Sequence, residues 1–142
     1  MSYAISAIKS FIINDGKFLI IKLNAAGTEV WDIPGGKIES DETPPAALKR
    51  EVKEEVGIDI EIGNIAGQTW FNKASDDKLV VVTNYFSTPK TLDIDTTKNP
   101  AGDDVIEYKW VTKEEFLKDE YIAEVPGKKN NLKELVAELD FD

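Results

Sequence analysis

One predicted helix, bounded by residues that start and stop helices, stands between two pairs of apolar β-runs. Thr43 followed by Pro44 is typical of a helix N-cap with proline in the first turn, and Gly57 is typical of the position just past a helix end. The sequence therefore predicts a helix over residues 44–56. Strands on both sides of such a helix favour folds in which helices pack against a sheet. We expect an α/β domain with a mixed β-sheet between helices.

The β-runs on either side of this helix predict two hairpins. Residues 3–13 and 17–23 are joined by "NDG", and Asp-Gly between apolar runs is a strong hairpin signal. Residues 58–72 and 78–87 are rich in Ile, Val and aromatic side chains, and the polar stretch "KASDDK" between them predicts a turn.

The rest of the chain predicts loops and a few short elements. Residues 24–30 are expected to form a loop, and "WDIPGG" at 31–36 is expected to be a strand that ends in a tight backbone bend. Residues 88–104 contain two prolines and several Asp and Thr, which predicts a long loop. The remaining expected elements are a strand at 105–111, a short helix starting at a capping box of Thr112 and Glu115, and a final helix over about 131–139.

Composition restricts the chemistry that the chain can perform. Its 142 residues, 42% of them hydrophobic, suit one folded domain over 1–142. A net charge of −10 argues against a nucleic-acid polymer or an anionic membrane as partner. The absence of Cys and His excludes disulfides, zinc–thiolate sites and His-based triads. Residues 3–13 lack the features of a secretory leader, so we expect a soluble, cytoplasmic protein.

Three glutamates crowd the end of the predicted helix. Glu51 and Glu55 stand four residues apart, where like charges face each other and destabilise a helix. At 100° per residue, these two and Glu54 share a sector about 100° wide, distinct from an apolar stripe that faces the core. Arg50 can pair with Glu54 at four-residue spacing. The core-facing stripe consists of Leu48, Val52 and Val56.

This crowding has two interpretations. It is a solvated acidic face, or it is a site for a divalent cation such as Mg²⁺ or Mn²⁺, which take hard oxygen ligands. Negative charge near the C-terminal end of a helix is unfavourable, which favours the second interpretation.

Residues 36–58, "GKIESDETPPAALKREVKEEVGI", resemble the Nudix box at every defined position. The match consists of Gly36, Glu42, Arg50, Glu51, apolar Val52, Glu54, Glu55, Gly57 and apolar Ile58. "WDIPGG" before the box, the hairpin after it and "W-V-x-x-E-E" near the end extend the resemblance over nearly the whole chain. "PGGKIE" resembles the MutT-like branch of the family.

The resemblance implies the Nudix α/β/α sandwich and hydrolysis of a nucleoside diphosphate linked to another group. It implies that Glu51, Glu54 and Glu55, together with the carbonyl of Gly36, hold Mg²⁺, with Mn²⁺ as a substitute. The metal would neutralise the diphosphate and lower the pKa of a bound water.

The resemblance also implies roles for neighbouring residues. Arg50 would orient Glu51 or Glu54, and Glu42 would pair with Arg50, although an exposed glutamate is the alternative for Glu42. Family members take their general base from the box or from a later loop. We favour Glu54 as base and Asp104 as an auxiliary metal ligand, with a solvated turn as the alternative for the aspartates. The later candidates are Asp103, Asp104 and Glu107.

Substrate-binding residues are harder to select from the sequence. Lys22 and Lys37 are candidates for the phosphates, and Trp70 and Tyr85 are candidates for stacking on the base. Each has an ordinary alternative, an exposed lysine or a core aromatic. Phe71 and Trp31 are further aromatic candidates, and we interpret Trp31 as structural.

The resemblance of "PGGKIE" to the MutT-like branch implies hydrolysis of a (deoxy)nucleoside triphosphate to monophosphate and pyrophosphate. Alternatives are hydrolysis of ADP-ribose, a nucleotide sugar or a dinucleoside polyphosphate, and a non-catalytic Nudix module that senses a nucleotide. We expect a small nucleotide as the partner of a monomer or homodimer.

Overall fold

The computed structural model of the chain describes residues 3–97 and 105–142. Its strands are β1 (Ile5–Asn14), β2 (Lys17–Ala25), β3 (Thr28–Asp32), β4 (Gly35–Lys37), β5 (Ile60–Asn72), β6 (Leu79–Pro89) and β7 (Val105–Val111). Its helices are α1 (Pro44–Val56), α2 (Lys113–Phe116) and α3 (Leu132–Glu138).

The described strands form one sheet with both parallel and antiparallel neighbours. Its main order is β3-β2-β1-β6-β5, while β4 also pairs with β1 and β7 pairs with β2. β1 and β6 run parallel, and the other described pairs run antiparallel. The mixed sheet is the one predicted from the order of apolar runs.

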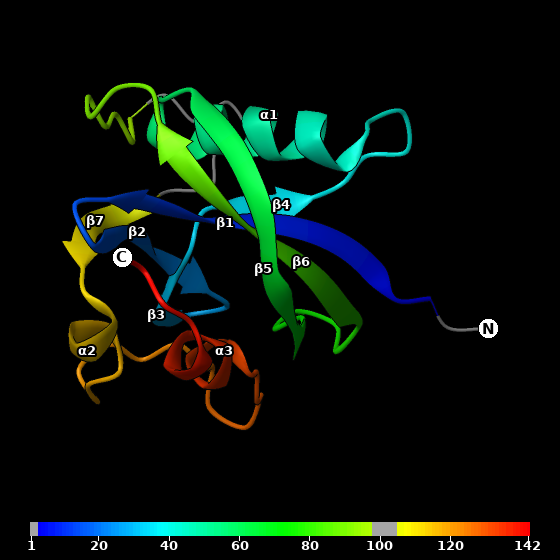
Figure 1. Cartoon of the computed structure of the whole chain (residues 1–142). Helices are drawn as coiled ribbons and strands as arrows, with labels where there is room; N and C mark the ends of the chain where they lie inside the picture. The colour runs from blue at the N-terminus through cyan, green and yellow to red at the C-terminus, as the bar shows by residue number, and fades with distance from the viewer. Residues whose placement is uncertain (1–2, 98–104) are drawn as a thin grey trace.

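Helices cover both faces of this sheet, as Figure 1 shows, with α1 on one side and α2 and α3 on the other. The face under α1 buries Ile8 and Ile12 of β1 against the predicted stripe of the helix. The opposite face buries Phe11 of the same strand against Phe116 of α2 and Val136 of α3. β1 is buried on both faces because it is central, which explains its nearly continuous apolar run. The stripe residues Leu48, Val52 and Val56 are all 0% exposed.

Several predicted elements are confirmed at their boundaries. The helix spans the predicted residues, with Thr43 Oγ1 accepting a hydrogen bond from the Ala46 amide and Gly57 in the left-handed conformation at its end. The capping box of Thr112 and Glu115 is present at α2. The turn at 73–78 joins β5 and β6, and the Lys73 amide donates to the Lys78 carbonyl.

The loop expected at 24–30 is wrong. β2 continues to Ala25 and β3 begins at Thr28, so a two-residue turn of Ala26 and Gly27 joins two paired strands. Both turn residues have positive φ, 51° and 91°, as a tight hairpin turn of the primed type requires. Ala26 is an unusual residue for that conformation, so the turn has no clear signal in the sequence.

A second difference follows "WDIPGG". The expected strand ends at Asp32, but the chain then forms β4, which pairs antiparallel with β1 through Ala7–Lys37 and Lys9–Gly35. This short strand places the paired glycines between β1 and α1. No helix in the described part of the chain has the length and apolar character needed to cross a membrane.

Candidate active site

The acidic residues of α1 face β4 across a short gap. The side chains of Glu51 and Glu54 are 18% and 24% exposed, so both are partly shielded from water. Glu55 is buried, with 8% of the residue exposed. The three glutamates of the predicted acidic sector therefore differ in exposure, and Glu55, the most buried, lies next to the apolar stripe.

Arg50 connects the acidic side chains to one another. Its guanidinium makes a two-point contact with Glu42, Nε to Oε2 at 2.6 Å and Nη2 to Oε1 at 2.8 Å. Nη1 donates to Glu51 at 3.0 Å and lies 3.3 Å from Glu54. The predicted Glu42–Arg50 pair is present. The hydrogen bonds from Arg50 lower the pKa of Glu42 and leave its carboxylate ionised.

The paired glycines allow the backbone to approach this acidic face closely. A Cβ atom on Gly36 would lie 2.5 Å from Cδ of Glu51, so any side chain there would displace the carboxylate. Gly35 has a φ of 148°, and its amide donates to Oε1 of Glu55 at 2.7 Å. Two glutamates thus contact one short strand at points where a larger residue has no room.

Burial changes the acidity of two of these glutamates. Burial raises the pKa of Glu55 to about 8, although the Gly35 amide and the charge of Lys9 act in the opposite direction. Burial also raises the pKa of Glu51, against the effect of Arg50. Without a further positive charge, ionising all of these carboxylates at once is therefore unfavourable.

The donor set suits a hard divalent cation. The group offers carboxylate oxygens from Glu51, Glu54 and Glu55. It is short of positive charge, since among the described residues a single guanidinium, that of Arg50, contacts Glu42, Glu51 and Glu54. As the side chains stand within the described residues, no set of three or more Asp or Glu is arranged to hold a metal ion. Arg50 takes up oxygens of Glu51 and Glu54, so binding a cation there requires these side chains to turn.

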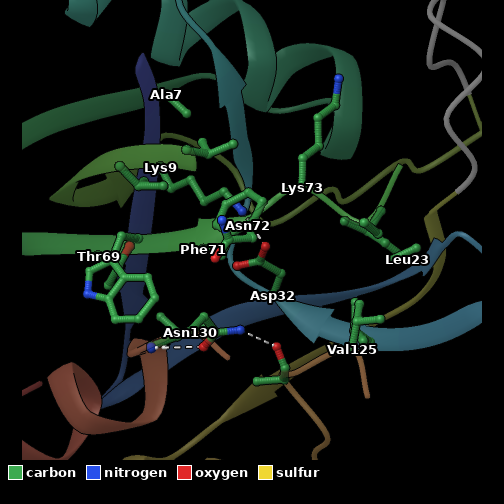
Figure 2. Close-up of a pocket in the computed structure, with 18 of the residues that line it drawn as sticks. Ala7, Lys9, Leu23, Asp32, Thr69, Phe71, Asn72, Lys73, Val125 and Asn130 are labelled. Atoms are coloured by element: carbon green, nitrogen blue, oxygen red, sulfur yellow. Dashed lines mark hydrogen bonds and ion pairs between the residues drawn. The ribbon is translucent and has the colours of Figure 1, made fainter. Parts of the chain in front are cut away.

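A cavity of about 380 Å³ opens beside the same glycines, on the sheet face opposite α1. This volume is in the range of small-molecule sites. Figure 2 shows Phe71 near the centre between Lys9 and Asp32, with Thr69 to the left and Asn130 below. Gly35, Gly36 and Lys37 of β4 line it, so one strand borders both the acidic face and the cavity.

A partly buried ion pair lies inside this cavity. Lys9 is 9% exposed and pairs with Asp32, while its ammonium lies 5.2 Å from the ring centre of Phe71. Asp32 Oδ1 also accepts a hydrogen bond from the Ile33 amide at 2.7 Å. Both charges therefore have partners despite their burial.

Of the predicted substrate-binding residues, the structure brings two to the cavity. Lys37 lines it from β4, and Trp70, 42% exposed, lines it from β5. Lys37 is accompanied by Lys73 from the turn after β5, and its contact with this second ammonium lowers the pKa of Lys37. Two adjacent ammonium groups suit a phosphate, although the carboxylate of Asp76 in the same turn offsets part of their charge.

The other two predicted substrate-binding residues lie elsewhere. Tyr85 is partly buried and packs against the core under α1. Lys22 lies 3.5 Å from Glu107 and 3.8 Å from Glu29, with its ammonium 5.2 Å from the ring centre of Trp31. Neither lines the described cavity. Trp31 is 6% exposed, which confirms its structural interpretation.

Of the later acidic candidates, Glu107 alone lies within the described residues. Asp103 and Asp104 lie outside the described residues. Glu107 on β7 is paired with Lys22 and Lys109.

Sequence reasoning missed the polar residues inside the cavity. Lys9, Asp32, Thr69 and Asn84 lie on four different strands and line it together. The one local indication was Lys9, a charged residue within an apolar run. The others carry no recognisable spacing because strand pairing, and not sequence distance, brings them together.

Comparison with known proteins places this arrangement in a family. The NUDIX domain model matches residues 5–134. The crystal structure of the MutT protein from Methanosarcina mazei Go1 is 30% identical, with a TM-score of 0.72 over 85% of this chain and 86% of that chain.

Two curated relatives match over shorter segments. The MutT-like protein of Streptomyces ambofaciens is 38% identical over 65 residues, which are 46% of this chain and 41% of that protein. The CTP pyrophosphohydrolase of Escherichia coli K12 is 38% identical over 61 residues, which are 42% of this chain and 45% of that protein. The chain thus spans less than half the length of these two relatives.

The family model covers β1 through the first turn of α3, including the acidic helix, the paired glycines and the strands that line the cavity. The α/β fold with a mixed sheet between helices is shared with the Methanosarcina protein. On this evidence the chain belongs to the Nudix family.

Proposed function

We propose that this protein hydrolyses a phosphoric anhydride in a nucleoside diphosphate linked to another group. The preferred substrate is a (deoxy)nucleoside triphosphate, which water converts to a nucleoside monophosphate and pyrophosphate. The observation that carries the proposal is the position of β4, which has partly buried glutamates on one side and a cavity of about 380 Å³ on the other. The name of the Escherichia coli relative, CTP pyrophosphohydrolase, supports a triphosphate substrate.

Mg²⁺ is the proposed cofactor, with Mn²⁺ as a substitute. When bound, it would neutralise the anhydride and make a bound water more acidic. Glu51, Glu54 and Glu55 with the Gly36 carbonyl would hold it. Arg50 keeps Glu42 and Glu51 in place through its hydrogen bonds, which limits the positions that the metal-binding carboxylates can take.

The chain's own groups divide the remaining work. Glu54, the most exposed of the three, is the proposed base because its oxygens can reach water and Arg50 holds its orientation. Lys37 and Lys73 would bind phosphate oxygens at the cavity edge. Trp70 and Phe71 offer apolar ring surface in the cavity to a base.

A substrate panel tests this proposal. Nucleoside triphosphates, ADP-ribose, nucleotide sugars and dinucleoside polyphosphates are incubated with and without Mg²⁺, and both products are identified by chromatography. Hydrolysis in ¹⁸O-labelled water shows which phosphorus is attacked. We expect monophosphate and pyrophosphate from a triphosphate, only with the metal.

Glu54→Gln is the key variant and Glu61→Gln, an exposed glutamate on β5, is its matched control. Retained nucleotide binding by the wild-type protein with no product from any substrate would refute catalysis and favour the nucleotide-sensing module. The proposed location is the cytoplasm, which cell fractionation tests.

A further inference from the structure

A buried side chain in the cavity has an oxygen atom without a partner. Asn84 on β6 is 0% exposed and lines the cavity. Within the described residues, its Oδ1 atom accepts no hydrogen bond. Buried amide oxygens are normally paired, and leaving one unpaired is unfavourable for the folded protein.

The orientation of this amide is fixed by its neighbours. Nδ2 of Asn84 donates to the Gly67 carbonyl at 3.2 Å and to Thr69 Oγ1 at 3.0 Å. A backbone carbonyl can only accept a hydrogen bond, so the nitrogen of the amide must face Gly67. The oxygen is therefore the atom without a partner, and because it is buried, a ligand reaches it only when the surrounding side chains shift.

Thr69 supplies a donor beside this acceptor. Its Oγ1 accepts from Asn84, and within the described residues this hydroxyl donates no hydrogen bond. Thr69 is 5% exposed and also lines the cavity. Asn84 and Thr69, which we call the amide–hydroxyl pair, thus present an acceptor and a donor side by side.

The surroundings of the amide–hydroxyl pair leave few other uses for it. Ala7, Val80 and Val82 form an apolar wall beside it and line the same cavity. The nearby charges of Lys9 and Asp32 are already paired with each other. A few fixed polar groups among apolar walls are what a small-molecule site uses to select its ligand.

We propose that the amide–hydroxyl pair recognises the edge of a nucleobase on which an N–H donor lies beside an acceptor. Asn84 Oδ1 accepts from the base N–H, and the Thr69 hydroxyl donates to the neighbouring acceptor. The inference rests on the proposed function, since it requires that the cavity bind nucleotides. It adds which part of the nucleotide is recognised, the hydrogen-bonding edge of the base. A base whose N–H is methylated lacks the donor, and a site built to pair with a donor rejects such an analogue.

Calorimetric titration with nucleosides tests this inference without metal and without turnover. Cytidine, uridine, adenosine and guanosine are titrated into the wild-type protein. The nucleoside that binds most tightly is then compared with its analogue methylated at the exocyclic or ring N–H, for example N4,N4-dimethylcytidine or N3-methyluridine. We expect methylation to weaken binding by about 10- to 100-fold.

Three variants assign that discrimination to the amide–hydroxyl pair. Asn84→Leu removes the acceptor, and we expect it to bind the parent and methylated nucleosides equally. Thr69→Val keeps the β-branched shape that suits a strand and removes the donor, so we expect weaker binding of the parent nucleoside. Asn64→Leu, an exposed position on β5 outside the cavity, is the matched control and should keep the wild-type discrimination.

The inference is overturned if no nucleoside binds the wild-type protein at millimolar concentration, or if the methylated analogue binds as tightly as its parent. It is also overturned if either cavity variant keeps the full wild-type behaviour. If circular dichroism shows Asn84→Leu to be unfolded, Thr69→Val decides the question alone. Because nucleoside binding needs neither metal nor hydrolysis, a failure of the proposed catalysis leaves this test valid.

Discussion

Replacing Glu55 by Gln should stabilise the metal-free protein at alkaline pH. Gln has nearly the same shape, and its Oε1 can still accept the hydrogen bond that the Gly35 amide donates to Glu55 at 2.7 Å. What the substitution removes is the charge. Burial raises the pKa of Glu55 to about 8 in the folded protein, whereas the ordinary value is 4.5.

The sign of the effect follows from these two values. Below pH 4.5 the carboxyl is protonated in both the folded and the unfolded state, so it makes no difference to stability. Between 4.5 and about 8 the unfolded chain loses the proton while the folded protein retains it, so the wild-type protein becomes less stable as pH rises. Above about 8 that loss is complete.

The magnitude follows from the same difference. A tenfold change in a protonation equilibrium is worth about 1.4 kcal/mol, so the shift from 4.5 to about 8 corresponds to at most about 5 kcal/mol. Local relaxation and water entry reduce such penalties, and we expect Glu55→Gln to exceed the wild type by about 2–5 kcal/mol at pH 9. At pH 4 the two proteins should have equal free energies of unfolding.

Urea denaturation in EDTA, followed by circular dichroism between pH 4 and pH 9, measures this difference. Glu61→Gln, which alters an exposed glutamate, should follow the wild type at every pH. Mg²⁺ at pH 8 should stabilise the wild type more than Glu55→Gln. A difference between wild type and Glu55→Gln that does not grow with pH would refute the reasoning, because it would mean that Glu55 ionises in the folded protein as it does in water.

Three further substitutions test the packing and the acidic face. Gly36→Ala places a Cβ atom 2.5 Å from Cδ of Glu51, so we expect kcat to fall about 10- to 100-fold and the free energy of unfolding to fall by about 1–3 kcal/mol. Normal steady-state kinetics for this variant would contradict the close approach. Arg50→Lys cannot hold Glu42 at two points while contacting Glu51, so kcat should fall at least about tenfold, and an unchanged rate would show that these contacts are dispensable. Leu48→Ala empties a position that is 0% exposed and should lower the free energy of unfolding in urea by about 2–5 kcal/mol, whereas a loss below about 1 kcal/mol would mean that the core closes over the gap.

Local features of the sequence were enough to predict the helix and its acidic residues. Thr43, Pro44 and Gly57 determine where α1 begins and ends through backbone hydrogen bonds within a few residues. The pairing of Glu42 with Arg50 spans eight positions, and it was expected from the resemblance to the Nudix box, not from helical spacing.

The cavity was less predictable because it depends on which side of a strand faces it. Asn84 and Tyr85 are neighbours on β6, and successive side chains of a strand point to opposite faces. Tyr85 was chosen for its ring, yet it faces the core under α1 while Asn84 lines the cavity. The sequence shows that side chains of β6 alternate between the two faces of the sheet, but it does not show which face carries the cavity. That depends on how β6 pairs with β1 and β5, whose residues are distant in the sequence.

The strand β4 has a consequence for which substrates such a protein can tell apart. Its three residues separate Glu51 and Glu55 from the cavity by the thickness of a single backbone, and its pairing with β1 keeps it from sliding. The base end and the reactive phosphate of a nucleotide would therefore be held at one nearly constant spacing, set by the thickness of the paired strand between them. Ligands could therefore differ mainly in the leaving group, the part beyond the hydrolysed bond, because β4 does not restrict its size. An insertion or deletion of one residue in β4 would alter that spacing and reset which ligand length fits.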